Sequence, residues 1–161
     1  ITATALMYSY LSSRGANVIR YIPDRLSEGY GLNCDAVRAL DKSGMSSVTV
    51  AVKAGIETMN QFKGYQKVVC LSDMLELGDN EVKYHKEIGS YIKKSQIVDD
   101  LICTGELSFH TADKGGGKWL ETKEECIKYL EKYRDKKAVI LIKGSRATAM
   151  DKVVKELRKA K

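Results

Sequence analysis

The sequence lacks the features of several classes of protein. No apolar run approaches the roughly 20 residues that a membrane-spanning helix needs, so we expect no contact with a membrane. Residues 1–10 lack the basic start of a secretory signal, and we expect a cytoplasmic protein. The spacing GxxxxGK[ST] of a phosphate-binding loop occurs nowhere in the chain, which excludes an ATP site of that type.

Patterns that would bind a metal are also scarce. The chain has four cysteines and two histidines, and no two cysteines form a CxxC pair. Such scattered ligands do not make a zinc site, so we expect neither a metal nor another cofactor. Most of the cysteines stand among apolar neighbours, which predicts buried free thiols. They are Cys34, Cys70, Cys103 and Cys126.

The composition is that of one globular unit. The 161 residues are 43% hydrophobic and 30% charged, which is enough apolar surface for one hydrophobic core. We therefore predict a single composite domain over residues 1–161. The net charge of +6 is spread along the chain instead of gathering in one stretch, which does not favour a nucleic-acid surface.

The spacing of apolar residues predicts alternating helices and strands. Helices are predicted over residues 3–11 (ending near Gly15), 34–42, 48–59, 81–94, 122–133 and 147–159. Strands are predicted over residues 17–22, 67–73, 99–104 and 138–143, with a short edge strand at Trp119. This alternation predicts an α/β fold, namely a three-layer Rossmann-like sandwich whose mostly parallel sheet has helices on both faces.

The stretch KGSR, residues 143–146, is the strongest candidate binding site. We expect it to leave the last strand and enter the last helix, where backbone N–H groups, a hydroxyl and two cations suit a phosphate or a carboxylate. The candidate ligand-binding residues are Lys143, Ser145 and Arg146. Ordinary helix capping by Ser145 explains the same pattern, and both interpretations stay open.

Other polar patterns favour structural roles. Asp73, Glu76 and Asp79 hint at a cation site, but acidic residues before a helix also satisfy its dipole. The run KGGGK at residues 114–118 is typical of a surface loop. His85 lies on the inward side of its predicted helix, which favours a hydrogen-bonded structural histidine. No Ser, His and acid arrangement stands out, so we predict no catalytic residue.

Residues 1–44 resemble the segment after the DHxDG motif of the RecJ family of single-stranded-DNA exonucleases. The matching stretches are ITATALMYSYLSSRGANV, PDRLSEGYGLN and LDKSG, which we interpret as a helix, strand and helix with a loop over residues 24–33. The resemblance implies that Arg25, Glu28 and Tyr30 are remnants of the family's loop. The family's metal-binding aspartates lie in motifs that are absent here, so it implies no phosphodiester hydrolysis.

Residues 45–161 resemble the C-terminal domain of the MurF family of UDP-muramoyl-tripeptide D-alanyl-D-alanine ligases. The matching stretches are VAVKAGIETM, LSDMLELGDN, ICTGEL and KGSRATAMDKVV. Ser72 replaces the glycine more usual in that family's LGDM motif, and the strand with a DAYNANP-like loop ahead of Val48 is absent. The family binds ATP mainly through a central domain whose GKT loop does not occur here.

Two incomplete resemblances predict an engineered or recombinant chimera that folds without catalytic activity of its own. In it, residues 17–22 would replace the missing first strand of the ligase-like sheet. Two alternatives stay open: a ligase C-terminal fragment that binds nucleotide or peptide substrate, and a fragment that binds single-stranded nucleic acid. We expect no obligatory partner, and we leave open weak anion or nucleotide binding and self-association.

Overall fold

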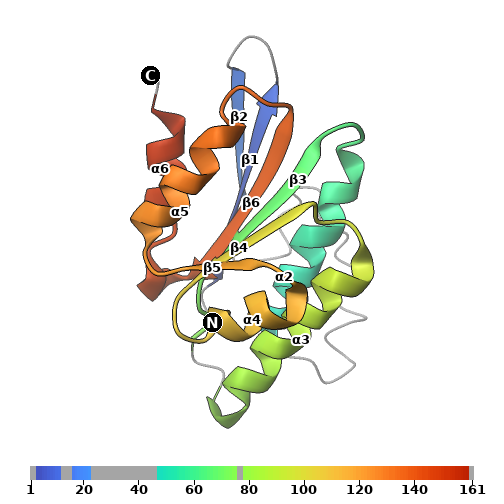
Figure 1. Cartoon of the computed structure of the whole chain (residues 1–161), viewed down its shortest axis with the longest axis vertical. Coiled ribbons are helices and arrows are strands. Elements are labelled where there is room, and N and C mark those ends of the chain that lie inside the picture. Colours follow the sequence, from blue (N-terminus) through green and yellow to red (C-terminus); the bar gives the residue numbers. More distant parts are fainter. Residues whose placement is uncertain (1–2, 12–15, 23–46, 76–77, 160–161) are drawn as a thin grey trace.

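The computed structural model describes residues 3–11, 16–22, 47–75 and 78–159. Within them, six strands form one sheet in the order β2-β1-β6-β3-β4-β5 (Figure 1). The strands are β1 (Ala3–Leu11), β2 (Ala16–Ile22), β3 (Gln66–Leu71), β4 (Asp100–Thr104), β5 (Lys118–Leu120) and β6 (Ala138–Ser145). Strands β6, β3, β4 and β5 are parallel, whereas β1 pairs antiparallel with both β6 and β2.

Helices cover both faces of the sheet. One face carries α2 (Ser47–Thr58), α3 (Glu81–Ser95) and α4 (Ser108–Gly115). The other face carries α5 (Lys123–Leu130) and α6 (Asp151–Arg158). This is the predicted three-layer α/β sandwich. In the described part of the chain, no helix combines the length and the apolarity needed to cross a membrane.

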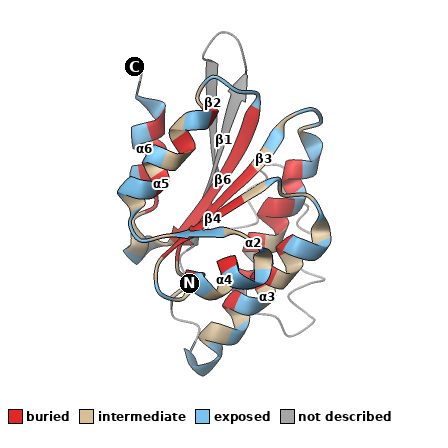
Figure 2. Cartoon of the chain, viewed as in Figure 1, coloured by how far each residue is buried: buried red, intermediate tan, exposed pale blue. Residues whose placement is uncertain are grey.

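The central strands are buried on both faces. Side chains of a strand point alternately to opposite sides, so Val69 and Leu71 of β3 join one core while Val68 and Cys70 join the other. Figure 2 shows β3, β4 and β6 largely buried, with exposure at the outer sides of the helices, in the loops and in the edge strand β5. Burial on both faces explains why β3 is a nearly continuous apolar run.

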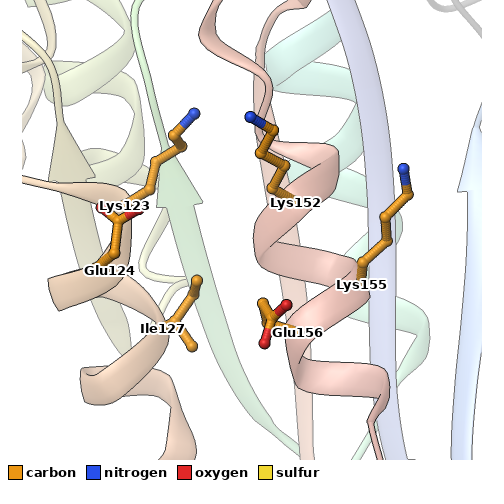
Figure 3. A pocket seen from close by; sticks show the side chains of 6 residues that line it. All are labelled: Lys123, Glu124, Ile127, Lys152, Lys155 and Glu156. Atoms are coloured by element: carbon orange, nitrogen blue, oxygen red, sulfur yellow. The ribbon is translucent and has the colours of Figure 1, made fainter.

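Short helices form the α5–α6 side. Cys126 and Leu130 of α5, together with Val153 and Leu157 of α6, are almost completely buried against the sheet. The outer side of the two helices is polar, and a groove runs between them (Figure 3).

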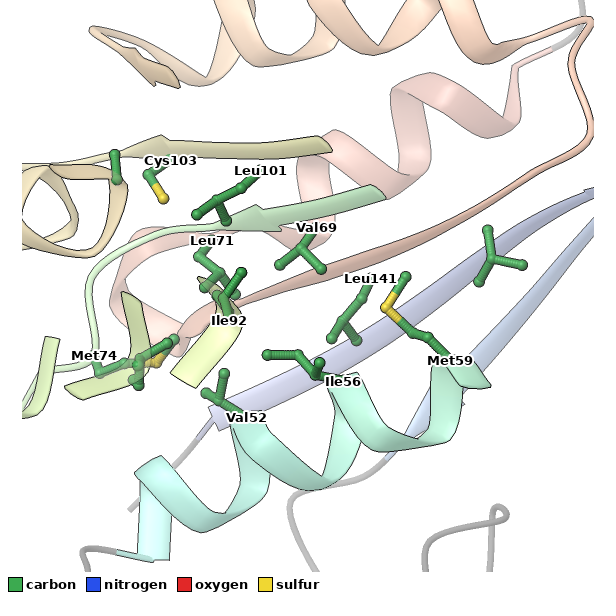
Figure 4. Packing of buried hydrophobic residues seen from close by; sticks show 13 residues of the cluster. Val52, Ile56, Met59, Val69, Leu71, Met74, Ile92, Leu101, Cys103 and Leu141 are labelled. Atoms are coloured by element: carbon green, nitrogen blue, oxygen red, sulfur yellow. The ribbon is translucent and has the colours of Figure 1, made fainter. Parts of the chain in front are cut away.

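The opposite core lies between the sheet and α2. Val52 and Ile56 of α2 and Met59 of the 3-10 turn that follows it (Met59–Gln61) are fully buried, at intervals of four and three residues. Figure 4 shows them projecting toward the sheet, where Leu141 of β6 lies. Each such side chain contributes about 1.5–3 kcal/mol when it leaves water. The predicted helix over residues 48–59 is therefore confirmed.

The first predicted element is wrong: residues 3–11 form strand β1 instead of a helix. β1 pairs with β6 from Ala3 opposite Ser145 to Ser9 opposite Val139, and so satisfies an edge of β6 that would otherwise lack hydrogen bonds. Long-range pairing outweighs a helical spacing of apolar residues in so short a segment. Residues 1–44 therefore begin with two strands, in place of the predicted helix and strand. The predicted loop 24–33 and helix 34–42 lie outside the described residues.

The second predicted element is confirmed as a strand, in a different place. β2 lies at the end of the sheet and pairs with β1, with Ile22 opposite Ala5 and Ala16 opposite Leu11. The N-terminal segment therefore does complete the sheet, as predicted. The strand next to β6 is β1, however, and not residues 17–22.

Close backbone contact joins α3 to α4. A Cβ atom added to Gly89 of α3 would lie 2.4 Å from the carbonyl oxygen of Thr111 and 2.8 Å from the Cβ atom of Lys114. A Cβ on Gly115 would lie 2.6 Å from Leu101 Cδ2. The interpretation of residues 114–118 as a surface loop is therefore wrong. They end α4, with Gly116 as a left-handed cap, and begin the edge strand β5, which confirms the strand expected at Trp119.

We expect Gly89→Ala to destabilise the protein by about 1–3 kcal/mol, because its methyl group meets fixed backbone of α4. This steric cost outweighs the gain of about 1 kcal/mol that alanine brings to a helix interior. Urea unfolding of the variant measures the difference, and Ser90→Ala on the same helix is the control. A Gly89→Ala variant as stable as the parent would contradict the backbone contact.

Candidate functional site

The direction of the chain across the sheet reverses between β3 and β6. From β3 the chain passes through α3 to β4 and on to β5, and α5 then returns it across the opposite face to β6. In open α/β sheets, ligands bind beyond the carboxyl ends of the strands at such a point. The candidate site therefore comprises the loops after β3, β4 and β6, over residues 72–75, 105–107 and 146–150.

Hydrogen bonds join the loops after β3 and β6. The Ser72 N–H donates to the Lys143 carbonyl at 2.9 Å, and the Ser145 N–H donates to the Asp73 carbonyl at 3.0 Å. The Leu75 N–H donates to Ser145 Oγ at 2.7 Å. The pairing of the two strands thus continues past the end of β3, and Ser145 holds the β3 loop through both its backbone and its hydroxyl.

Gly144 allows this close approach. A Cβ atom there would lie 2.6 Å from Thr148 Oγ1 and 3.0 Å from Ser72 Cβ. The Thr148 hydroxyl in turn donates to the Ser145 carbonyl at 2.5 Å. The turn after β6 is therefore closed on itself and pressed against the loop after β3.

Asp73 brings a carboxylate to the site. Its Oδ1 accepts the Ser108 N–H at 2.8 Å and so caps the first turn of α4. Gly105 makes room for it: this glycine has φ +104, and a Cβ there would lie 2.4 Å from Asp73 Oδ1. Among the described residues none donates to Asp73 Oδ2. The half-buried carboxylate is thus held in place with one oxygen available to a ligand.

The acidic residues after β3 do not act together. Asp73 satisfies the dipole of α4 and not that of the following helix α3, while Asp79 is exposed in the turn before α3. Glu76 lies outside the described residues. Within the described ranges, no group of three His, Cys, Asp or Glu side chains is placed to hold a metal ion.

His85 of α3 holds the loop after β3 in place through a hydrogen bond. It is 1% exposed, its Nε2 accepts the Met74 N–H at 3.0 Å, and its Nδ1 lies 2.7 Å from the Glu81 carbonyl oxygen. Because Nε2 accepts a hydrogen bond, Nδ1 carries the proton and donates it to Glu81. Burial lowers the pKa of His85, so the ring is neutral. The prediction of a hydrogen-bonded structural histidine is confirmed.

The predicted anion-binding residues lie at the site in an unexpected arrangement. β6 continues to Ser145, a 3-10 turn covers Arg146–Thr148, and α6 begins only at Asp151. KGSR therefore does not enter a helix directly, because pairing with β1 extends the strand to Ser145. The Ser145 hydroxyl caps no helix and binds the β3 loop instead. Lys143 is 1% exposed, on the side of the sheet that faces α2.

The remaining predicted residues divide between the described chain and the rest. The Arg146 side chain, and the loop residues Arg25, Glu28 and Tyr30, lie outside what the structure describes. The anion-binding role of Lys143, Ser145 and Arg146 stays a prediction. Three of the four cysteines are free and buried as predicted, namely Cys70, Cys103 and Cys126, and Cys34 is outside the described residues.

Sequence reasoning missed the contributions of α4 and β5. The role of Asp73 as a cap depends on α4, which the spacing of apolar residues does not predict. The Trp119 indole N–H donates to the Gly105 carbonyl at 2.8 Å and so holds the loop after β4. The N-cap position of α4 is Leu107, whose side chain cannot accept a hydrogen bond, so the cap comes from a remote side chain that no local pattern indicates.

Comparison with known proteins gives two similarities. The family described as "Mur ligase, glutamate ligase domain" matches residues 48–146. The UDP-N-acetylmuramoyl-tripeptide--D-alanyl-D-alanine ligase of Buchnera aphidicola subsp. Acyrthosiphon pisum is 35% identical over 123 residues, which are 74% of this chain and 26% of the ligase. The ligase of the same name from Haemophilus influenzae is 34% identical over 105 residues, 60% of this chain and 22% of the ligase.

The second similarity is to an exonuclease. The single-stranded-DNA-specific exonuclease RecJ of Bacillus subtilis is 38% identical over 63 residues, which are 39% of this chain and 8% of the exonuclease. Both predicted resemblances are therefore confirmed. The exonuclease matches 39% of the chain and the Buchnera ligase matches 74%. Together these fractions are more than the whole chain, so the two matched regions overlap. The chain spans about a quarter of the length of the ligases that it matches.

The hypothesis of an engineered chimera that only folds is wrong. A ligase family matches most of the chain, and several ligases of one name are related to it across more than half of its length. The alternative of a ligase C-terminal segment fits these findings better. These findings give no support to an artificial origin.

The buried, neutral His85 predicts a loss of stability in acid. Its pKa is lowered in the folded state, so below the unfolded value of about 6.5 the unfolded chain binds more protons and the stability falls as the pH falls. We expect a loss of at most about 1.4 kcal/mol per pH unit between roughly pH 6.5 and the lowered folded pKa.

Urea unfolding at a series of pH values tests this expectation. The His85→Gln variant should lose the slope, whereas His110→Gln should keep it because His110 is the smallest of the influences on the pKa of His85. A slope that persists in His85→Gln would assign the effect to other groups.

Proposed function

We propose, given that this chain belongs to the family described as "Mur ligase, glutamate ligase domain", that it is the C-terminal part of a D-alanyl-D-alanine-adding ligase and binds the dipeptide substrate. The names of its relatives refer to a UDP-N-acetylmuramoyl tripeptide and to D-alanyl-D-alanine. The binding site would be the crevice beyond the carboxyl ends of β3, β4 and β6.

The charges of the crevice support a zwitterionic ligand. A dipeptide has an ammonium group at one end and a carboxylate at the other. The available oxygen of Asp73 suits the ammonium group, because a charge-assisted hydrogen bond is stronger than a neutral one. Lys143 and Ser145 lie at the end of β6, directly before the neighbouring loop, and the Ser145 N–H bond joins them to Asp73. We propose that this second loop, with Arg146, receives the carboxylate.

Complete turnover would require the rest of a ligase. The chain matches about a quarter of its relatives' length and carries no GxxxxGK[ST] sequence to hold a nucleoside triphosphate. We propose that this segment contributes substrate binding, and that ATP-driven bond formation occurs only together with the remaining parts of the enzyme.

Titration of the chain with D-alanyl-D-alanine, followed by calorimetry or by amide NMR shifts, tests the proposed binding. We expect a dissociation constant in roughly the millimolar range. Asp73→Asn should weaken binding about tenfold, because it removes the negative charge but keeps an oxygen that can cap α4. Asp79→Asn, an exposed position on the same stretch, is the matched control.

L-alanyl-L-alanine and ATP serve as comparison ligands. Tighter binding of ATP than of either dipeptide would assign the crevice to the nucleotide. If the parent chain and the Asp73→Asn variant bind both dipeptides with the same affinity, the proposed peptide site is ruled out.

We also propose that residues 1–161 form one composite domain. Seven residue pairs join β1 to β6, which itself pairs with β3 in the middle of the ligase-like sheet. A unit joined in this way should unfold cooperatively. The single tryptophan, Trp119, reports on the far end of the sheet because β5 and β2 are its two edges.

The Leu6→Pro variant tests this cooperativity. Leu6 is paired on both sides, with Tyr21 of β2 and with Ile142 of β6, so proline there removes a ladder hydrogen bond on one side or the other. In a composite domain, the Trp119 fluorescence transition in urea should move to lower denaturant in Leu6→Pro and stay nearly in place in Leu6→Val. An unmoved transition in Leu6→Pro would show that residues 1–22 unfold separately.

A further inference from the structure

The groove between α5 and α6 lies on the opposite side of the sheet from α2. It has a volume of about 440 Å³. Its lining residues are Lys123, Glu124, Ile127, Lys152, Lys155 and Glu156. Figure 3 shows the side chains of Lys123 and Lys152 extending toward the same end of the groove, with Ile127 and Glu156 farther along it. Both lysines belong to the first turn of their helices.

Ion pairs along α6 neutralise other charges beside the groove, including that of Asp151, which precedes Lys152 in the first turn of the helix. Lys155 pairs with Asp151 at 3.1 Å, and Glu156 pairs with Lys159 at 2.6 Å. Among the described residues Glu124 has no ion-pair partner, and it is exposed on α5. The charges left for a ligand are therefore the ammonium groups of Lys123 and Lys152 and the carboxylate of Glu124, which follows Lys123 in the first turn of α5.

The Lys123 ammonium group is held in place without being neutralised. It donates to the Thr148 carbonyl at 3.0 Å, in the turn after β6, and its side chain is half-buried. This bond uses one of three N–H donors and leaves the full positive charge. Lys152 is exposed, and no described residue pairs with it. Two like charges that converge on one end of a groove attract an anion there.

We propose that the Lys123–Lys152 end of this groove binds a phosphate group. A phosphate dianion matches two ammonium groups in charge, and lysine binds phosphate well as a point charge. A carboxylate carries only one charge, and fits less well. The Thr148 contact places the phosphate beside the turn that follows KGSR, on cations that the sequence pattern did not indicate.

The proposal stands apart from dipeptide binding in the crevice. It depends on Lys123 and Lys152, whereas the dipeptide site depends on Asp73. Failure at one site therefore leaves the other unaffected. The phosphate has two sources, a free inorganic anion or the diphosphate of a nucleotide, and the experiment below distinguishes them.

Amide NMR titration of the full chain with inorganic pyrophosphate measures the affinity. Lys123→Gln and Lys152→Gln should each weaken binding about twofold to fivefold, and the double variant should weaken it further. Lys128→Gln removes an exposed charge of α5 outside the groove and is the matched control. The affinity should also fall as salt is added, because the site is open to solvent. Equal affinity in the parent chain and the double variant would overturn the proposal, as would an equal loss in Lys128→Gln.

Comparison of ligands identifies the source of the phosphate. Tighter binding of UDP or ADP than of pyrophosphate, lost in the double variant, would assign the groove to a nucleotide diphosphate. Equal binding of all three would assign it to the phosphate alone. Binding of uridine or adenosine as tight as that of the diphosphates would overturn the proposal, because these nucleosides carry no phosphate. Urea unfolding of each variant confirms that the exposed substitutions leave the fold intact.

Discussion

The pairing of β6 on both of its edges is the constraint on which this structure depends. β6 lies in the middle of the sheet with nearly every residue buried, so each of its N–H and C=O groups must find a partner within the protein. On one side β3 supplies these partners in parallel register. On the other side β1 supplies them in antiparallel register. The same pairing carries β6 onward to Ser145, which is the residue that holds the loop after β3.

The local pattern of the sequence predicts the ligase-like part of the fold well. Helical spacing over residues 81–94 places His85, Ile88, Gly89 and Ile92 on one side of the helix, and these are the four buried residues of α3. This success has a physical reason: α3 is long enough for its spacing to be unambiguous, and β3, β4 and β6 are apolar because both faces of the sheet are covered. The fold class follows from this alternation alone.

Elements that depend on remote partners could not be predicted in this way. β1 has a helical spacing of apolar residues and becomes a strand because an open edge of β6 accepts it. α4 is eight residues long, and its cap is Asp73, thirty-five positions away. The site shows the same division: the sequence pointed to residues 143–146, whose anion-binding role stays a prediction, but burial of Lys143 and the internal role of the Ser145 hydroxyl come from packing.

The direct backbone contact between α3 and α4 has a mechanical consequence. With glycine at position 89 there is no layer of side chains between the helices that could change rotamer and let one slide over the other. We therefore expect α3 and α4 to move together as one rigid body. His85 of α3 and the first turn of α4 form hydrogen bonds with two consecutive residues, Met74 and Asp73. Any displacement of the loop after β3 would therefore be transmitted to both helices at once, and the stiffness of the α3–α4 pair limits how far this loop can move.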